Sequence, residues 1–132
     1  MRIMIDTNIL ISLIIFPSPN MNKIIEIISK EHTIVLSSYI IDELKEVVKR
    51  KFSTKYEYLD KFLIELPYEL VYTPEVINID KYPFIRDKKD LPILVSAINE
   101  GVDILLTGDK DFSELDIEKP DIFTPSEFLN IY

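Results

Sequence analysis

Short apolar runs alternate along this chain with segments whose apolar residues recur every three or four positions. The runs predict a buried strand at 2–6, further strands at 33–36, 102–106 and 121–123, and an extended piece at 69–72. The periodic segments predict helices at 21–29, 39–51, 54–66 and 90–99. Strands that are apolar throughout and alternate with helices are typical of a parallel sheet covered on both faces, so we predict an α/β fold.

Capping and chain-breaking residues support several of these boundaries. Ser37 or Ser38 can cap the helix that follows the second strand, and Gly101 can end the last predicted helix. The helix at 54–66 is rich in aromatic residues, and we expect most of its rings in the core. The proline-containing stretch 73–84 predicts a connection over the surface.

Length and composition indicate one domain. The chain has 132 residues, is 47% hydrophobic and contains no internal repeat or low-complexity segment, so we expect a single domain over 1–132. The apolar run at 9–16 is too short to span a bilayer, and Asp6 and Asn8 interrupt a signal-peptide pattern. The absence of cysteine excludes disulfides and thiolate metal sites and favours a cytoplasmic location.

Four acidic residues stand at or near the ends of predicted elements: Asp6, Glu43, Asp90 and Asp109. Sites in open α/β sheets form beyond the carboxyl ends of strands, and Asp6 and Asp109 each follow such an end. Carboxylates that share a small volume repel one another unless a cation offsets their charge. Oxygen ligands favour Mg²⁺ or Mn²⁺ over Zn²⁺, and such a site suits phosphate chemistry.

Each of these acids also has a simpler interpretation. Asp6 can cap the following helix, Glu43 can lie on a solvated helix face, and Asp109 can belong to an ordinary Gly-Asp turn. Asp87 and Asp90 flank the start of a helix, so one can cap it while the other projects from its first turn. We favour Asp90 as the ligand and Asp87 as the supporting or capping residue, and the two could exchange roles.

Charge and the remaining polar residues narrow the function classes. A net charge of −8 opposes nucleic-acid binding, although basic residues group locally at 45–55 and 86–89. Such groups are often only solvated helix faces. His32 is the single histidine and has no evident partner, and Gly101 and Gly108 are the only glycines. A histidine-based zinc site, a P-loop and a dinucleotide fingerprint are therefore not expected.

The order and spacing of several motifs resemble a PIN domain over essentially the whole chain: MIDTNILIS, SSYIIDELKEVV, RDKKDLPILVSAI, DILLTGDKDF and IFTPSEFL. The resemblance extends to short single-domain bacterial and archaeal members described as toxins. It implies a three-layer α/β/α sandwich with a central parallel sheet, and a ribonuclease that needs Mg²⁺ or Mn²⁺. It also implies that the catalytic and metal-binding acids are Asp6, Glu43, Asp90 and Asp109, with supporting polar residues at Asn8, Thr107 and Asp111.

The same resemblance implies partners. They are an RNA substrate, a second copy of the chain in a homodimer, and a cognate antitoxin whose basic side chain occludes the acidic pocket. Two other classes stay open. A phosphatase of the haloacid-dehalogenase type also begins with a strand and an Asp, but it needs a second Asp where this chain has Asn8. A domain of the same fold could instead bind a partner or nucleic acid without catalysis.

Overall fold

A computed structural model describes all 132 residues, and its strands form one five-stranded parallel sheet. In chain order the strands are β1 Arg2–Ile5, β2 Thr33–Ser37, β3 Tyr68–Val71, β4 Ile104–Leu106 and β5 Asp121–Phe123. Their order across the sheet is β3-β2-β1-β4-β5, so the first strand of the chain is the central one. The predicted α/β fold with a parallel sheet is confirmed.

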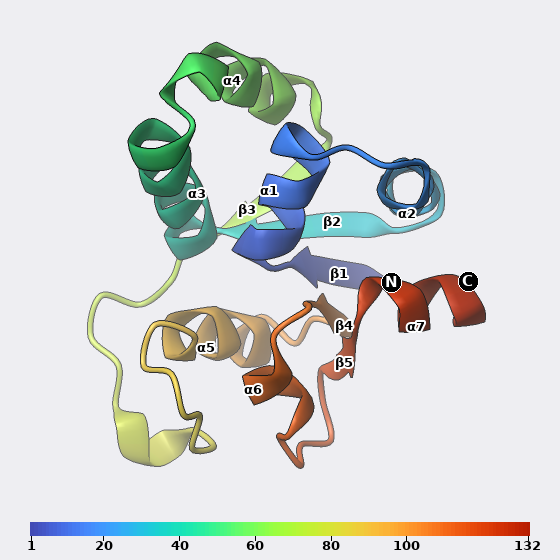
Figure 1. Cartoon of the computed structure of the whole chain (residues 1–132). Coiled ribbons are helices and arrows are strands. Elements are labelled where there is room, and N and C mark those ends of the chain that lie inside the picture. Colours follow the sequence, from blue (N-terminus) through green and yellow to red (C-terminus); the bar gives the residue numbers. More distant parts are fainter.

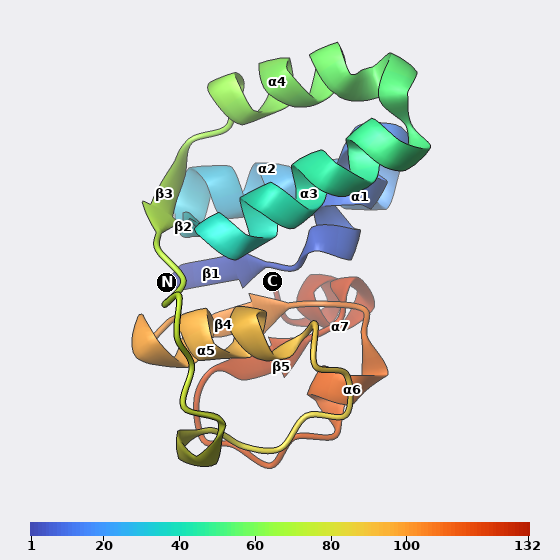
Figure 2. The same cartoon turned by 90° about the vertical axis from the view of Figure 1, so that its left-hand side faces the viewer.

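Helices cover both faces of this sheet. They are α1 Thr7–Ile15, α2 Pro19–Glu31, α3 Ser38–Lys51, α4 Tyr56–Glu65, α5 Leu91–Asn99, α6 Lys110–Ser113 and α7 Pro125–Ile131, with 3-10 turns η1 Ser53–Lys55 and η2 Ile79–Lys81. Crossovers between parallel strands are right-handed. The chain moves from β1 to β3 in one direction across the sheet and from β3 to β5 in the other. Helices α1 to α4, which connect β1 to β3, therefore lie on one face, and α5 and α6, which connect β3 to β5, lie on the other, as Figures 1 and 2 show. Helix α7 packs against α2. This is the three-layer α/β/α sandwich.

The core lies around the central strands. Residues 3–5 of β1 and 104–106 of β4 are at most 1% exposed. Burial on both faces explains why these strands carry no polar alternation. Because the register of β1 against β4 aligns their carboxyl ends, the residues that follow them, Asp6 and Thr107, reach the same edge of the sheet.

Local caps fix where the elements begin and end. The Ser37 side chain accepts a hydrogen bond from the backbone N–H of Ile40 at 3.2 Å, which caps α3. Gly101, just beyond α5, has a φ of 60°, a conformation that favours glycine. None of the helices is both long enough and apolar enough to cross a bilayer.

The expectation that most rings of the helix at 54–66 lie in the core is confirmed in part, because Tyr56 and Phe62 pack against the core but neither is fully buried. The helix predicted at 54–66 is divided into η1 and α4, and Leu59 is the fully buried residue of α4. Tyr58 is 64% exposed, with the Lys55 ammonium 5.7 Å from its ring centre. Since α4 is an outer helix that packs on α3 and α1, only one narrow stripe of it faces the core.

Candidate metal centre

One cavity of about 360 Å³ brings all four predicted acids together. Asp6 follows β1, Glu43 lies on α3, Asp90 precedes α5 and Asp109 precedes α6. The cavity therefore lies beyond the carboxyl ends of the central strands, where sites form in open α/β sheets. The assignment of these residues as metal ligands stays a prediction.

Asp6 is held rigidly at the floor of this cavity. The residue is 3% exposed. Its Oδ1 accepts from the Thr7 backbone N–H at 2.7 Å, and its Oδ2 accepts from the Thr107 hydroxyl at 2.8 Å. Burial raises the pKa of Asp6 to about 6, the hydrogen bonds from Thr107 and Thr7 oppose that rise, and the charges of Glu43 and Asp109 add to it. The capping role predicted for Asp6 is confirmed, because its side chain caps α1, while its role as a metal ligand stays a prediction.

Asp90 is the most perturbed acid of the cavity. Its Oδ2 atom is buried and has no hydrogen-bond partner. Burial raises the pKa of Asp90 to about 8, helped by a hydrogen bond with Asp109 and by the charges of Asp109, Asp6 and Asp87. A carboxylate in such surroundings is expected to stay protonated unless a cation balances the group.

Of the two roles predicted for Asp87, the structure shows a supporting one and no cap on α5. Its Oδ1 accepts from the Lys89 backbone N–H at 2.9 Å, and its carbonyl accepts from the Asp90 N–H at 3.0 Å. Asp87 thus closes the turn before α5 and sets the position of Asp90. Asp90 itself occupies the N-cap position, without a side-chain cap hydrogen bond.

Asp109 and Asp111 differ in their surroundings. Asp109 caps α6, because its Oδ1 accepts from the Asp111 backbone N–H at 2.8 Å. Asp111, which the resemblance marks as an additional acid, receives two hydrogen bonds from the Arg86 guanidinium, at 2.9 and 3.2 Å. One carboxylate oxygen from each of Asp87, Asp90 and Asp111 lies within 4.8 Å of the others. The pairing of Asp111 with Arg86 has no sequence signal, since the two lie 25 positions apart.

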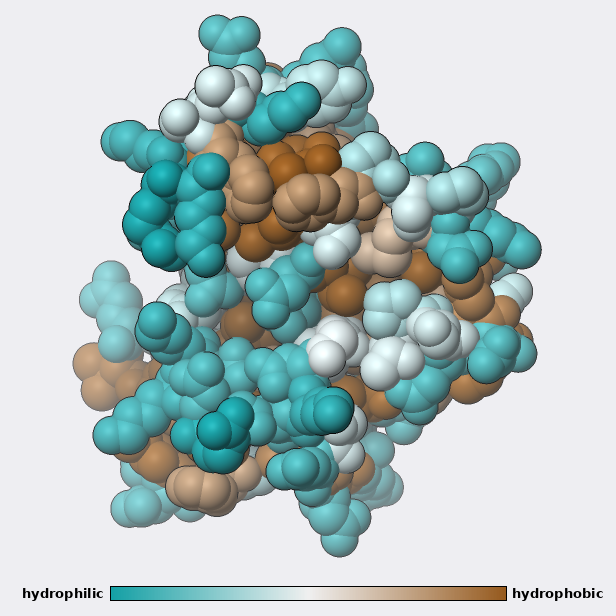
Figure 3. Space-filling view, viewed as in Figure 1, coloured by the Kyte–Doolittle hydropathy of each residue, from teal (hydrophilic) through white to brown (hydrophobic).

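Two basic residues and several apolar ones complete the cavity wall. Lys51 and Lys89 line it, and both belong to basic groups that the sequence alone could not distinguish from solvated faces. Phe52 also lines it, and its ring meets that of Phe16 edge to face at 5.8 Å. Figure 3 shows hydrophobic side chains gathered in the hollow between α1, α3 and α4. The acidic cavity therefore continues into an apolar surface.

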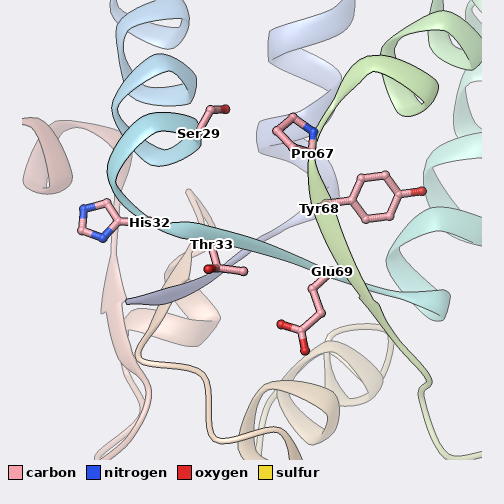
Figure 4. Close-up of a pocket in the computed structure, with 6 residues that line it drawn as sticks. All are labelled: Ser29, His32, Thr33, Pro67, Tyr68 and Glu69. Atoms are coloured by element: carbon pink, nitrogen blue, oxygen red, sulfur yellow. The ribbon is translucent and has the colours of Figure 1, made fainter.

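A second hollow, of about 420 Å³, lies at the opposite end of the strands and includes His32, Thr33 and Glu69. Figure 4 shows that its polar side chains point in different directions rather than toward a common point. His32 Nδ1 lies 3.3 Å from the N-terminal amine, and Glu69 binds Arg2 at 2.9 Å. Glu69 and one nitrogen of His32 are engaged in structural contacts, and the side chains of this hollow do not converge, so the acidic cavity is the better candidate site.

Comparisons with known proteins bear on the family and the fold of this chain. A family model described as PIN domain matches residues 2–111. A solved structure described as VapBC2 from Rickettsia felis bound to a DNA fragment from their promoter is similar, with a TM-score of 0.74 and 24% sequence identity. The alignment covers 94% of this chain and 98% of that one. At this identity the likeness supports the fold. A search of curated proteins found no match.

Proposed function

The chain belongs to the PIN domain family, a family of nucleases, and from that premise we propose that it is an endoribonuclease that depends on Mg²⁺ or Mn²⁺. The observation that carries the proposal is the convergence of Asp6, Glu43, Asp90 and Asp109 around one cavity. None of these acids forms an ion pair with a cationic side chain.

The residues present fit a divalent ion. Asp90 has a buried oxygen without a partner, and burial together with neighbouring negative charge raises the pKa values of both Asp90 and Asp6. A set of carboxylate oxygens is the donor set that Mg²⁺ and Mn²⁺ prefer. We assign Asp6, Glu43, Asp90 and Asp109 as the residues that hold the ion.

A divalent ion in such a site supplies charge neutralisation at the phosphate and lowers the pKa of water. The protein supplies the arrangement. Thr107 and Thr7 hold Asp6 in one orientation, while Asn8 at the cavity wall can orient a ligand or a water molecule. Lys51 and Lys89 can bind the phosphates that flank the scissile bond. The expected products carry a 5′-phosphate and a 3′-hydroxyl.

We also propose that the chain is the toxin of a type II toxin–antitoxin pair. The similar solved structure is named as a VapBC2 complex, which favours a cognate antitoxin as partner. The apolar surface around Phe16 and Phe52 lies beside the acidic cavity. An antitoxin segment with apolar side chains and one basic residue would cover both. Copurification of a small neighbouring gene product would support this, and its loss on Phe52→Asp would locate the contact.

Self-association is a further part of the proposal. The connection between β3 and α5 exposes four large apolar side chains by 66% to 89%: Tyr72, Val76, Ile79 and Phe84. Several exposed large apolar residues on one connection favour a protein interface, and we propose a homodimer. Light scattering coupled to size exclusion would give its mass. We expect the protein to act in the cytoplasm, where an RNA substrate and an antitoxin would both be found.

The deciding experiment is cleavage of mixed-sequence RNA by the purified protein with Mg²⁺ or Mn²⁺, against EDTA. Asp109→Asn should abolish cleavage while leaving the fold intact, and Asp60→Asn, an exposed acid of α4, is the matched control. Release of phosphate from small phosphomonoesters instead would favour the phosphatase alternative. A folded protein that cuts no RNA with either metal would favour the non-catalytic binding alternative.

A further inference from the structure

Arg86 and Asp111 form a bidentate ion pair beside the acidic cavity. Arg86 donates through Nε to Asp111 Oδ1 at 2.9 Å and through Nη2 to Oδ2 at 3.2 Å. The Asp111 side chain is 9% exposed, whereas that of Arg86 is 81% exposed. A buried carboxylate needs such a partner. The guanidinium, in contrast, is held in place and still faces solvent.

The pair leaves donors free on the guanidinium. Arginine carries five N–H donors in a fixed plane, and the two hydrogen bonds to Asp111 use one each from Nε and Nη2. Three donors therefore remain on the exposed side. Their planar geometry matches two oxygens of a phosphate, which a lysine ammonium cannot match in the same way.

The location of the pair connects it to the candidate metal centre. Arg86 precedes Asp87, whose turn sets the position of Asp90. The backbone N–H of Asp111 donates to Asp109 at 2.8 Å. The hydrogen bond with Asp111, with the nearby charges of Asp111, Asp87 and Asp109, raises the pKa of Arg86. A phosphate held at the cavity would thus lie next to an oriented cation.

We propose that Arg86 binds a backbone phosphate of the RNA next to the scissile bond, and that Asp111 is the positioning residue that orients its guanidinium. This inference rests on the proposed ribonuclease function. It gives Asp111 a role other than metal binding. The competing view is that the pair only ties the loop before α5 to α6.

Nuclear magnetic resonance of the arginine side chains can separate these two views, because the chain contains only Arg2, Arg50 and Arg86. All three donate through Nε to a carboxylate, so each serves as an internal control for the others. The probe is a short mixed-sequence single-stranded RNA. Ca²⁺ replaces Mg²⁺ so that the RNA is bound without being cut, because the longer ligand distances of Ca²⁺ do not fit the octahedral geometry of Mg²⁺. A gel verifies that the RNA stays intact, and Arg86→Lys assigns the Arg86 signal.

We expect RNA to shift the Arg86 Nε–H signal and to leave that of Arg2 unchanged. A shift confined to Arg50 would place the RNA backbone along α3 and overturn the inference. An unchanged Arg86 signal with RNA bound elsewhere would also overturn it while leaving the ribonuclease function standing. If the protein neither binds RNA nor cuts it with Mg²⁺ or Mn²⁺, the proposed function fails and the inference fails with it.

A binding series adds a second readout. Arg86→Gln should weaken RNA binding about tenfold, which is the lower end of the range for a charge-assisted hydrogen bond. It should also reduce the slope of log affinity against log salt by about one. Asp111→Asn should give a smaller loss that disappears in the Arg86→Gln background, and Arg86→Lys should restore the salt slope but not the full affinity. If the Arg86 and Asp111 variants have unchanged RNA affinity and salt slope and differ only by a lower melting temperature, the ion pair has only a structural role.

Discussion

Thr107 donates its hydroxyl hydrogen to Asp6 Oδ2 at 2.8 Å, although 101 positions separate the two residues. The same oxygen of Thr107 accepts from the backbone N–H of Asp109 at 3.0 Å. One hydroxyl group therefore joins the ends of β1 and β4 and fixes two of the four proposed ligands relative to each other.

Thr107→Val should damage both stability and activity, because valine keeps the shape of threonine but has no hydroxyl. Asp6 loses a donor, so its pKa should rise above about 6, and the Asp109 N–H loses its acceptor. We expect unfolding to become easier by about 1–3 kcal/mol and cleavage to fall roughly 10- to 100-fold. Denaturant unfolding and Mn²⁺ titration would measure these effects. Thr107→Ser should behave like the original protein, and equal behaviour of the valine variant would contradict the role of the hydroxyl.

The metal-free protein should lose stability as the pH rises from about 4 to 8. The pKa of Asp90 is raised from 3.8 to about 8 in the folded chain, and that of Asp6 to about 6. Between these limits the folded state binds more protons than the unfolded state, so the free energy of unfolding decreases as the pH increases. Melting temperatures in EDTA across this range would test the direction. Asp90→Asn should flatten the profile.

Mn²⁺ should counteract this loss, and more strongly at pH 8 than at pH 5. Binding requires deprotonated carboxylates, so acid weakens it. A ligand that binds only the folded state raises the free energy of unfolding in proportion to the logarithm of the ratio of the ligand concentration to its dissociation constant. An equal shift in melting temperature at both pH values would contradict the placement of Asp90 in the site.

The two glycines should respond differently to alanine. A Cβ at either Gly101 or Gly108 would meet no atom within 4 Å, but Gly101 alone has a positive φ, of 60°. Gly101→Ala should therefore cost about 1 kcal/mol of unfolding free energy from backbone strain alone. Gly108→Ala is the matched control and should be close to neutral. Chemical denaturation of both variants would measure these free energies of unfolding. Equal losses in the two variants would contradict the explanation by the positive φ of Gly101.

Asp103 should matter for stability and not for catalysis. It accepts from the Arg2 backbone N–H at 2.8 Å and pairs with Lys119 at 3.2 Å, at the end of β4 remote from the cavity. Asp103→Asn should leave RNA cleavage unchanged and lower the free energy of unfolding by less than about 1 kcal/mol, as expected for an exposed pair. A large fall in cleavage rate would indicate that the acidic cavity is not the site.

Much of the fold was accessible from the sequence because the central strands are buried on both faces. The apolar runs at 3–5 and 104–106 leave little alternative to a parallel sheet, and Asp6 and Asp109 follow from where those runs end. The exposure of Tyr58 on α4 was harder to predict. Periodicity identifies a helix, but it does not tell whether the helix lies inside the protein or on its rim.

Pairings between distant side chains escaped prediction. Arg86 and Asp111 are both ordinary charged residues in polar loops, and their ion pair depends on how the turn at Asp87 faces α6. The four-residue helix α6 was also absent from the prediction, since one turn is too short to show a hydrophobic period. Local patterns define elements, whereas such contacts appear only when the elements assemble.

The central position of β1 has a consequence for how the protein is made. β1 is synthesised well before its partner β4 and the acid at position 109. A growing chain that has passed Glu43 but has not reached Asp90 therefore carries only two of the four proposed ligands. If the completed cavity cuts RNA, the ribosome that makes it is exposed to no such activity until β4 and Asp109 have been synthesised.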